Sequence, residues 1–246
     1  MDDVLTSFNE LLRRRPPVAG VELADRVTRV LSGSWTGVLW SDLDAEVADA
    51  VIDREIERFT GLGAWEWKLC SFDAPHDLAD RLRAHGFVSE PVETLLMATL
   101  ADLALNASPP AGVELFAVED EHGVEALACV HEEAFGRPRP ALWRGLLDEI
   151  RDGRAGAVVA MAGGRPIGGG RIEFYGDTGF AGLFGGGTVP GWRRRGVFRA
   201  VVACRAAMAA RRGCRYLQTD ASDDSRPIFE RLGFARLGTT TPFIHA

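Results

Sequence analysis

The sequence contains one internal repeat, and this repeat restricts the fold more than any other feature. Residues 72–87 (FDAPHDLADRLRAHGF) align with residues 219–234 (TDASDDSRPIFERLGF), and five of the sixteen positions are identical. Each identical pair, such as Asp73 and Asp220, is 147 positions apart. In both copies a predicted strand, a short helix and a glycine precede another strand. The repeat indicates two copies of one unit in tandem. Chance similarity between two common strand–helix–strand units is the alternative.

The order of predicted elements favours an α/β or α+β fold with a mixed, mostly antiparallel sheet flanked by helices. Apolar spacing predicts helices over residues 18–31 and 43–59. The Gly163-Gly164 turn predicts a hairpin of the strands on either side of it. Residues 101–112 (ADLALNASPPAG) contain two prolines that disfavour a helix, so they are interpreted as a linker. The expected domains are therefore residues 1–102 and 111–246.

The composition is ordinary for a globular protein and limits the choice of partners. The 246 residues are 46% hydrophobic, which is enough for a buried core, and carry a net charge of −7, which argues against a nucleic-acid partner. There is no apolar run near the ~20 residues of a membrane span. The acidic N-terminus is unlike a signal peptide, and the four cysteines lack the spacing of a metal site. These features predict a cytoplasmic protein with no metal and no membrane association.

Three arginines, at positions 193–195, stand at the start of a predicted helix, where negative groups are normally favoured. The first N–H groups of a helix lack partners, and the macrodipole makes this end positive. The C-terminal end of the helix has the residues that are normally favoured there, because Arg211 and Arg212 suit its negative end and Gly213 is a suitable C-terminal cap. We expect an external anion at the helix start, bound by backbone N–H groups and arginines, with Gly196 allowing its close approach. A solvated arginine cluster is the alternative.

Around this helix start the sequence resembles the GCN5-related N-acetyltransferase (GNAT) family. The family motif Arg/Gln-x-x-Gly-x-Gly/Ala corresponds to residues 193–198 (RRRGVF), with Pro190 three residues earlier. The later motif Tyr-Glu-x-Leu-Gly-Phe corresponds to residues 229–234 (FERLGF). The resemblance implies the acyl-CoA N-acyltransferase fold for the C-terminal domain. The N-terminal domain is then interpreted as a degenerate second copy or an accessory domain. Phe198 and Phe229 depart from the family pattern.

The resemblance also implies acetyl-CoA as co-substrate and a primary amine of a small molecule or peptide as acceptor. The pyrophosphate would lie on the loop that begins the helix, and the pantetheine arm would lie beside the preceding strand end. The candidate cofactor-binding residues are Thr188, Val189, Arg193, Arg194, Arg195, Gly196, Val197 and Phe198. In the family a strand N–H polarises the thioester carbonyl, and Thr188 or Val189 is the candidate for that role.

Amine attack on a thioester requires removal of an amine proton and departure of a thiolate. Glu173 is the candidate base, because the alternation of Arg171, Glu173 and Tyr175 puts the three on one face of a predicted strand. A solvated face is the alternative. Phe229 replaces the family's tyrosine acid, so Ser225 is the candidate donor, with a helix N-cap as its alternative role.

Two functional hypotheses follow. The first is an N-acetyltransferase. The second is a non-catalytic acyl-CoA-binding sensor or partner module, which the loss of the tyrosine at Phe229 favours. Several tryptophans of the N-terminal half could line an acceptor cleft, with core packing as the alternative. The sequence leaves the oligomeric state open, and a homodimer is one arrangement considered.

Overall fold

The computed structural model describes residues 2–32, 35–103, 108–136, 140 and 143–246, which form two compact units. Unit 1 comprises residues 1–95, 220–223 and 237–246. Unit 2 comprises residues 96–219 and 224–236. Neither unit is one continuous segment, because residues 220–223 and 237–246 belong to unit 1 although they follow residues of unit 2 in the chain. The expected division into domains at residues 103–110 stays a prediction, and residues 104–107 lie outside the described part of the chain.

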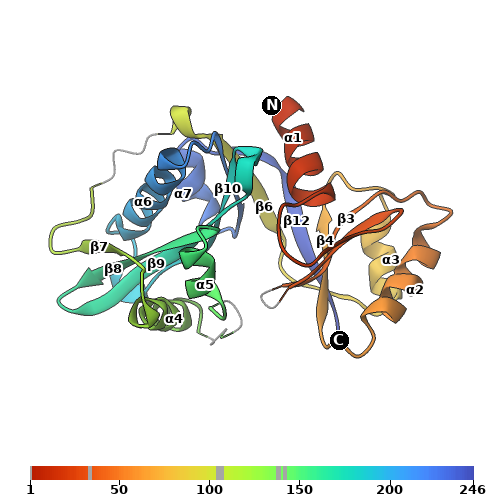
Figure 1. The fold of residues 1–246 in the computed structure, drawn as a ribbon, viewed down its shortest axis with the longest axis horizontal. Helices are drawn as coiled ribbons and strands as arrows, with labels where there is room; N and C mark the ends of the chain where they lie inside the picture. The colour runs from red at the N-terminus through yellow and green to blue at the C-terminus, as the bar shows by residue number, and fades with distance from the viewer. Residues whose placement is uncertain (1, 33–34, 104–107, 137–139, 141–142) are drawn as a thin grey trace. The chain divides into compact units, whose positions relative to one another are not determined.

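Unit 1 is a twisted sheet with strands in the order β1-β2-β3-β4-β12 (Figure 1). Strands β3 and β4 are parallel, and the other neighbours in this order are antiparallel. The elements are α1 (Asp2–Phe8), a π-helical turn (Asn9–Arg14), β1 (Val21–Leu23), β2 (Val27–Leu31), β3 (Thr36–Ser41), α2 (Ala48–Phe59), β4 (Trp65–Cys70), α3 (Leu78–Ala84), β5 (Val88–Ser89), β6 (Glu93–Thr99), which continues into unit 2, and β12 (Ala235–His245).

Alternate side chains of β4 form the core of unit 1 beneath α2 and α3. Trp65 and Trp67 are buried, and Trp65 stacks on Phe59 with ring centroids 4.2 Å apart. Phe87 meets Trp65 edge-on at 5.0 Å. These two tryptophans are therefore core residues, which is the alternative that the sequence left open.

The predicted helix over residues 18–31 is wrong, because this segment forms the β1–β2 hairpin. Gly20 has φ +76°, and the backbone N–H of Ala24 donates to the carbonyl of Val27 at 3.0 Å to close the turn. All four residues from Val27 to Val30 are buried, so apolar spacing alone does not distinguish the strand from a helix here. The β-branched residues of this segment are those that favour a pleated strand.

The two aspartates that the repeat relates each pair with one basic side chain of unit 1. Asp73 accepts both terminal nitrogens of Arg13, each at 2.7 Å. Asp220 forms an ion pair with Lys68 and accepts the hydroxyl of Thr240 at 3.1 Å. Both carboxylates are nearly buried, so each is held in place by its partners. These contacts give the two aspartates a structural role.

Carboxylates outnumber cations around Lys68. Burial raises the pKa of Glu93 to about 7, and the negative charges of Asp220 and Glu66 add to this effect. Burial likewise raises the pKa of Glu66, which accepts the indole N–H of Trp35 at 2.8 Å. Burial alone would lower the pKa of Lys68, but Asp220 and Glu66 outweigh it and raise the pKa.

We expect Glu93→Gln to stabilise the protein at pH 8 and to have no effect below about pH 4.5. The folded protein holds the Glu93 proton up to about pH 7, whereas the unfolded chain releases this proton at pH ~4.3. Between these values the folded state binds more protons, so the parent's free energy of unfolding falls as pH rises. The gain at pH 8 is about 1–3 kcal/mol, measured by denaturant unfolding. The exposed Glu46→Gln is the control; an equal gain there, or a gain for Glu93→Gln at pH 4, contradicts the assignment.

Unit 2 contains strands in the order β11-β10-β9-β8-β7 (Figure 1). Strands β10 and β11 are parallel, and the others are antiparallel. The elements are a 3-10 turn (Leu100–Asp102), β7 (Glu114–Ala117), α4 (Glu121–Phe135), α5 (Leu146–Arg151), β8 (Ala155–Ala162), β9 (Arg165–Phe174), a 3-10 turn (Gly176–Thr178), β10 (Phe180–Thr188), a 3-10 turn (Pro190–Trp192), α6 (Val197–Arg211), β11 (Tyr216–Ala221) and α7 (Arg226–Arg231).

Helices cover both faces of the unit 2 sheet: α4 and α5 lie on one face and α6 on the other (Figure 1). The predicted hairpin at Gly163-Gly164 is confirmed as the β8–β9 turn. The mixed, mostly antiparallel sheet flanked by helices is confirmed as well. Within the described residues, every helix is too short or too polar to cross a lipid bilayer.

Candidate functional site

The loop before α6 is shaped by two residues in left-handed backbone conformation. Arg194 has φ +62° and Gly196 has φ +88°. Gly196 occupies the N-cap position of α6, where no side chain caps the helix and no acidic residue lies in the first turn. The first backbone bond runs from the N–H of Ala200 to the carbonyl of Gly196, at 3.0 Å. The three N–H groups before Ala200 have no partner within the helix, and the loop curves as an anion-binding nest does.

The three arginines of this loop differ in their contacts. Arg193 donates to the carbonyl of Thr188 at 3.2 Å and to the carbonyl of Ala134 at 2.8 Å. Its guanidinium therefore links the loop to the end of β10 and to the end of α4. Arg195 stacks on the ring of Trp192 at 4.9 Å. All three arginines are exposed, so three positive side chains lie in solvent beside the uncapped helix start.

The two phenylalanines that replace family residues pack against each other. Phe198 meets Phe229 edge-on with centroids 5.5 Å apart, and Phe229 meets Phe234 at 5.0 Å. The edge of the Phe198 ring would lie 3.1 Å from a Cβ added at Gly186. The Phe198 ring therefore extends along the sheet side of α6 rather than into the loop.

Strand β10 leaves its parallel neighbour partway along its length. Its pairing with β11 is described from Phe180 to Gly182 only. At the far end, the N–H of Val189 donates to the carbonyl of Ile167 on β9 at 3.0 Å. Opposed residues of an antiparallel pair alternate between bonded and non-bonded, so the N–H of Thr188 points away from β9. Thr188 is thus the better placed of the two candidates for polarising a carbonyl.

On the α5 side of the sheet, Glu173 lies among polar groups. Arg171 approaches its carboxylate at 3.0 Å, and the Tyr175 hydroxyl donates to it at 3.4 Å. The predicted common face of these three residues is confirmed. Glu173 lies opposite Gly182 on β10, and its side chain is 27% exposed, so solvent and small molecules can reach the carboxylate. Burial, and then the charge of Glu173, raise the pKa of Glu149 on α5.

Sequence reasoning missed two further side chains of this face. A Cβ added at Gly182 would lie 2.7 Å from the Tyr175 hydroxyl oxygen, 2.8 Å from the amide nitrogen of Gln218 and 2.5 Å from the Phe184 ring. Gly182 is therefore the point where these side chains converge. No motif marks Gln218 or Phe184, because only the pairing of three strands brings them to Glu173.

Ser225 occupies the N-cap position of α7, but its side chain makes no capping hydrogen bond. The position of Ser225 therefore agrees with the N-cap alternative, but its side chain does not make the hydrogen bond that a capping residue makes.

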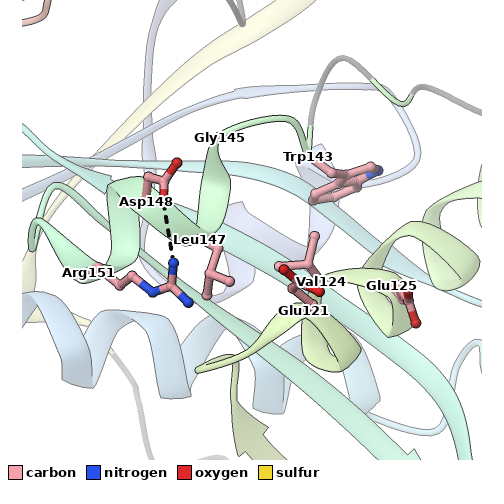
Figure 2. Close-up of a pocket in the computed structure, with 8 residues that line it drawn as sticks. All are labelled: Glu121, Val124, Glu125, Trp143, Gly145, Leu147, Asp148 and Arg151. Atoms are coloured by element: carbon pink, nitrogen blue, oxygen red, sulfur yellow. Dashed lines mark hydrogen bonds and ion pairs between the residues drawn. The ribbon is translucent and has the colours of Figure 1, made fainter.

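A separate cavity of about 330 Å³ lies beside α4 and α5 (Figure 2). It is lined by Glu121, Val124, Glu125, Trp143, Gly145, Leu147, Asp148 and Arg151. None of the predicted site residues lines it, so it is distinct from the loop at α6 and from Glu173.

Comparison with known proteins assigns the domain that carries these features to a class of group-transfer enzymes. The family model described as acetyltransferase (GNAT) family matches residues 116–234. This segment is therefore a domain of the GNAT family, a family of acyltransferases. No curated protein sequence matches the chain.

Solved structures share the fold over nearly the whole chain. A GCN5-related N-acetyltransferase from Kribbella flavida matches with a TM-score of 0.68 and 21% identity, over 98% of this chain and 92% of that one. A GCN5-related N-acetyltransferase from Sphaerobacter thermophilus matches with a TM-score of 0.65 and 13% identity, over 99% of this chain and 84% of that one. A tandem GNAT protein from the clavulanic acid biosynthesis pathway has a TM-score of 0.58 and 15% identity, over 89% and 78%. The acyl-CoA N-acyltransferase fold is thereby confirmed.

Proposed function

We propose that the protein transfers an acetyl group from acetyl-CoA to a primary amine of a small molecule or peptide. The observation that carries this proposal is the uncapped start of α6, where Arg194 and Gly196 adopt left-handed conformations. Backbone N–H groups and exposed arginines together suit a pyrophosphate, whose oxygens accept several charge-assisted bonds. The family to which residues 116–234 belong supports the acyl-transfer chemistry.

The proposed cofactor pose follows the chain from the loop to the strand. The pyrophosphate lies on the N–H groups of residues 194–198, with Arg194 and Arg195 as counter-charges. The pantetheine arm lies along residues 187–189, where β10 has no described pairing with β11. The N–H of Thr188 is directed to this open side, and we assign it to the thioester carbonyl, where it would stabilise the developing oxyanion.

Glu173 is the proposed base for the acceptor amine, acting directly or through one water. Arg171 and Tyr175 orient its carboxylate. Loss of the amine proton allows the nitrogen to attack the thioester carbon. The carbon–sulfur bond then breaks, giving the amide and CoA thiolate. A thiol with a pKa near ~8.5 leaves readily as thiolate, so the absence of a hydroxyl at Phe229 does not prevent the step. Ser225 stays a proposed donor to the thiolate.

We expect Glu173→Gln to lower kcat by roughly 10–100-fold, because the amide cannot accept the amine proton. The KM for acetyl-CoA should be unchanged, since Glu173 has no proposed contact with the cofactor. The measurement is release of free thiol from acetyl-CoA across a panel of primary amines. Glu133→Gln is the matched control. Glu133 lies at the exposed end of α4, and its carboxylate also pairs with an arginine, Arg165, at 2.7 Å. Equal losses in both variants would remove Glu173 from the mechanism.

The second candidate function is a non-catalytic acyl-CoA-binding module. The packing of Phe229 between Phe198 and Phe234 favours it, because the phenyl ring has no hydroxyl to donate to a leaving thiol. The same thiol assay separates the two functions. If acetyl-CoA binds and no amine of the panel accelerates thiol release over hydrolysis, the transferase proposal fails and the binding module stands.

A further inference from the structure

Arg205 is a buried cation on the sheet side of α6. It lies in the middle of α6 and is 1% exposed. Among the described residues no acidic group pairs with it, and its Nη2 has no hydrogen-bond partner. Burial lowers its pKa to about 10. Burying a charged guanidinium costs desolvation free energy. The contacts of Arg205 must offset this penalty.

The contacts of Arg205 join two strands of the unit 2 sheet. Its Nη1 donates to the carbonyl of Arg171 on β9 at 2.9 Å and to the carbonyl of Phe184 on β10 at 3.3 Å. A Cβ added at Gly170 would lie 2.7 Å from Nη1, and one added at Gly186 would lie 3.2 Å from Nη2. The guanidinium thus occupies a slot that exists because both flanking residues are glycines.

This slot is at the one place where the pairing of β9 and β10 shifts. Phe184 opposes Arg171, but Gly187 opposes Gly169, so β10 contains one extra residue here. Gly185, within this bulge, has φ +57°. The two carbonyls that Arg205 binds belong to the last regular pair before the bulge.

The bulge decides where the N–H of Thr188 points. Before it, the N–H of Tyr175 donates to the carbonyl of Phe180, so the bonded pairs involve even-numbered residues of β10. After it, the N–H of Val189 donates to Ile167, so the bonded residues are odd-numbered. If β10 paired with β9 residue for residue, without the bulge, Thr188 would oppose Ile167 instead of Gly168, in a bonded pair, and its N–H would face β9.

We propose that Arg205 is a positioning residue that clamps the β10 bulge and thereby keeps the Thr188 N–H on the open side of the strand. This inference rests on the proposed function, in which that N–H binds the thioester carbonyl. A buried arginine is suited to the task because one planar group can donate to both strands. The clamp would exist in the free protein, so the acyl-binding strand would be preformed.

Hydrogen exchange tests the clamp without any ligand. We expect Arg205→Met to accelerate exchange by about tenfold or more in the segments 183–188 and 169–172, because two bonds from a charged donor are lost. Arg205→Lys, which keeps the charge but has one terminal nitrogen, should recover part of the protection. It also serves as the test variant should Arg205→Met not fold. The exposed Arg211→Met, on the same helix, is the control. Unchanged exchange, or equal acceleration throughout unit 2, overturns the inference.

Calorimetry with CoA and acetyl-CoA tests the link to the acyl group. The loop at α6 is intact in Arg205→Met, so CoA affinity should stay within about threefold, and the ratio of acetyl-CoA to CoA affinity should fall towards one. An unchanged ratio overturns the link to Thr188. If the parent binds neither ligand, the proposed function fails, and hydrogen exchange still decides the role of Arg205 in the bulge.

Discussion

Gly196→Glu will abolish acetyl-CoA binding while the protein stays folded. The parent should bind acetyl-CoA in the micromolar range, about −7 to −8 kcal/mol, and the variant at least about 100-fold more weakly. The substitution puts a carboxylate among the N–H groups proposed for the pyrophosphate, where like charges repel and the donors are occupied. Space is not the cause, because the nearest atom to an added Cβ is Pro110 Cγ at 3.9 Å. Calorimetric titration measures the effect.

The matched control for this variant is Gly213→Glu, at the other end of the same helix. Gly213 has φ +73°, close to the φ +88° of Gly196, and no atom lies within 4 Å of an added Cβ. Both variants therefore carry the same charge and similar backbone strain, but only one changes the proposed phosphate loop. Equal weakening in the two would assign the effect to strain. Absence of binding by the parent would remove acetyl-CoA from the proposed function.

Arg13→Met will destabilise the protein by about 3–5 kcal/mol, the cost of leaving a buried charge without its partner. Arg13 is 2% exposed and Asp73 is 5% exposed, and their two bonds of 2.7 Å fix both side chains. Asp73 also accepts the backbone N–H of Cys70 at 2.8 Å, so its carboxylate cannot move to solvent without breaking the turn after β4. Denaturant unfolding gives the free energy.

Two further variants isolate the buried charge as the cause. Arg14→Met removes the neighbouring arginine, whose side chain is 48% exposed and pairs with Glu10 at 3.3 Å, and should cost no more than about 1 kcal/mol. Adding Asp73→Asn to Arg13→Met removes the unpaired charge and should recover part of the loss. If Arg13→Met costs no more than Arg14→Met, the Arg13–Asp73 pair is not a major source of stability.

The sequence predicts helix α6 and the glycine-containing loop before it well, because their signals are local, and phosphate binding at this loop stays a prediction. An arginine run, Gly196 and an apolar stripe of period three to four lie within one short segment. In the structure Val197 and Val201 are buried in the core, and Cys204 and Met208 pack against it. The face shared by Arg171 and Glu173 is predicted for the same reason, since alternation along one strand needs no partner.

Features that depend on distant pairing could not be predicted in the same way. The segment 18–31 has an apolar spacing compatible with a helix. It forms two strands instead, because β1 and β2 pair across the turn between them. The sequence left Thr188 and Val189 equivalent, and only the bond from Val189 to Ile167 on β9 separates them. Arg205 carries no motif at all, because its slot exists only when a bulge and two glycines meet α6.

The assignment of β12 to unit 1 affects any attempt to study the two halves of the chain as fragments. Residues 237–245 of β12 follow all of unit 2 in the sequence, yet β12 pairs with β4 from Thr240 to His245. A fragment beginning at residue 111 would carry this strand without its partner, and the complementary fragment would leave β4 an open edge prone to association. A single cut cannot release an intact unit, so the GNAT domain should be expressed and assayed only within the whole polypeptide.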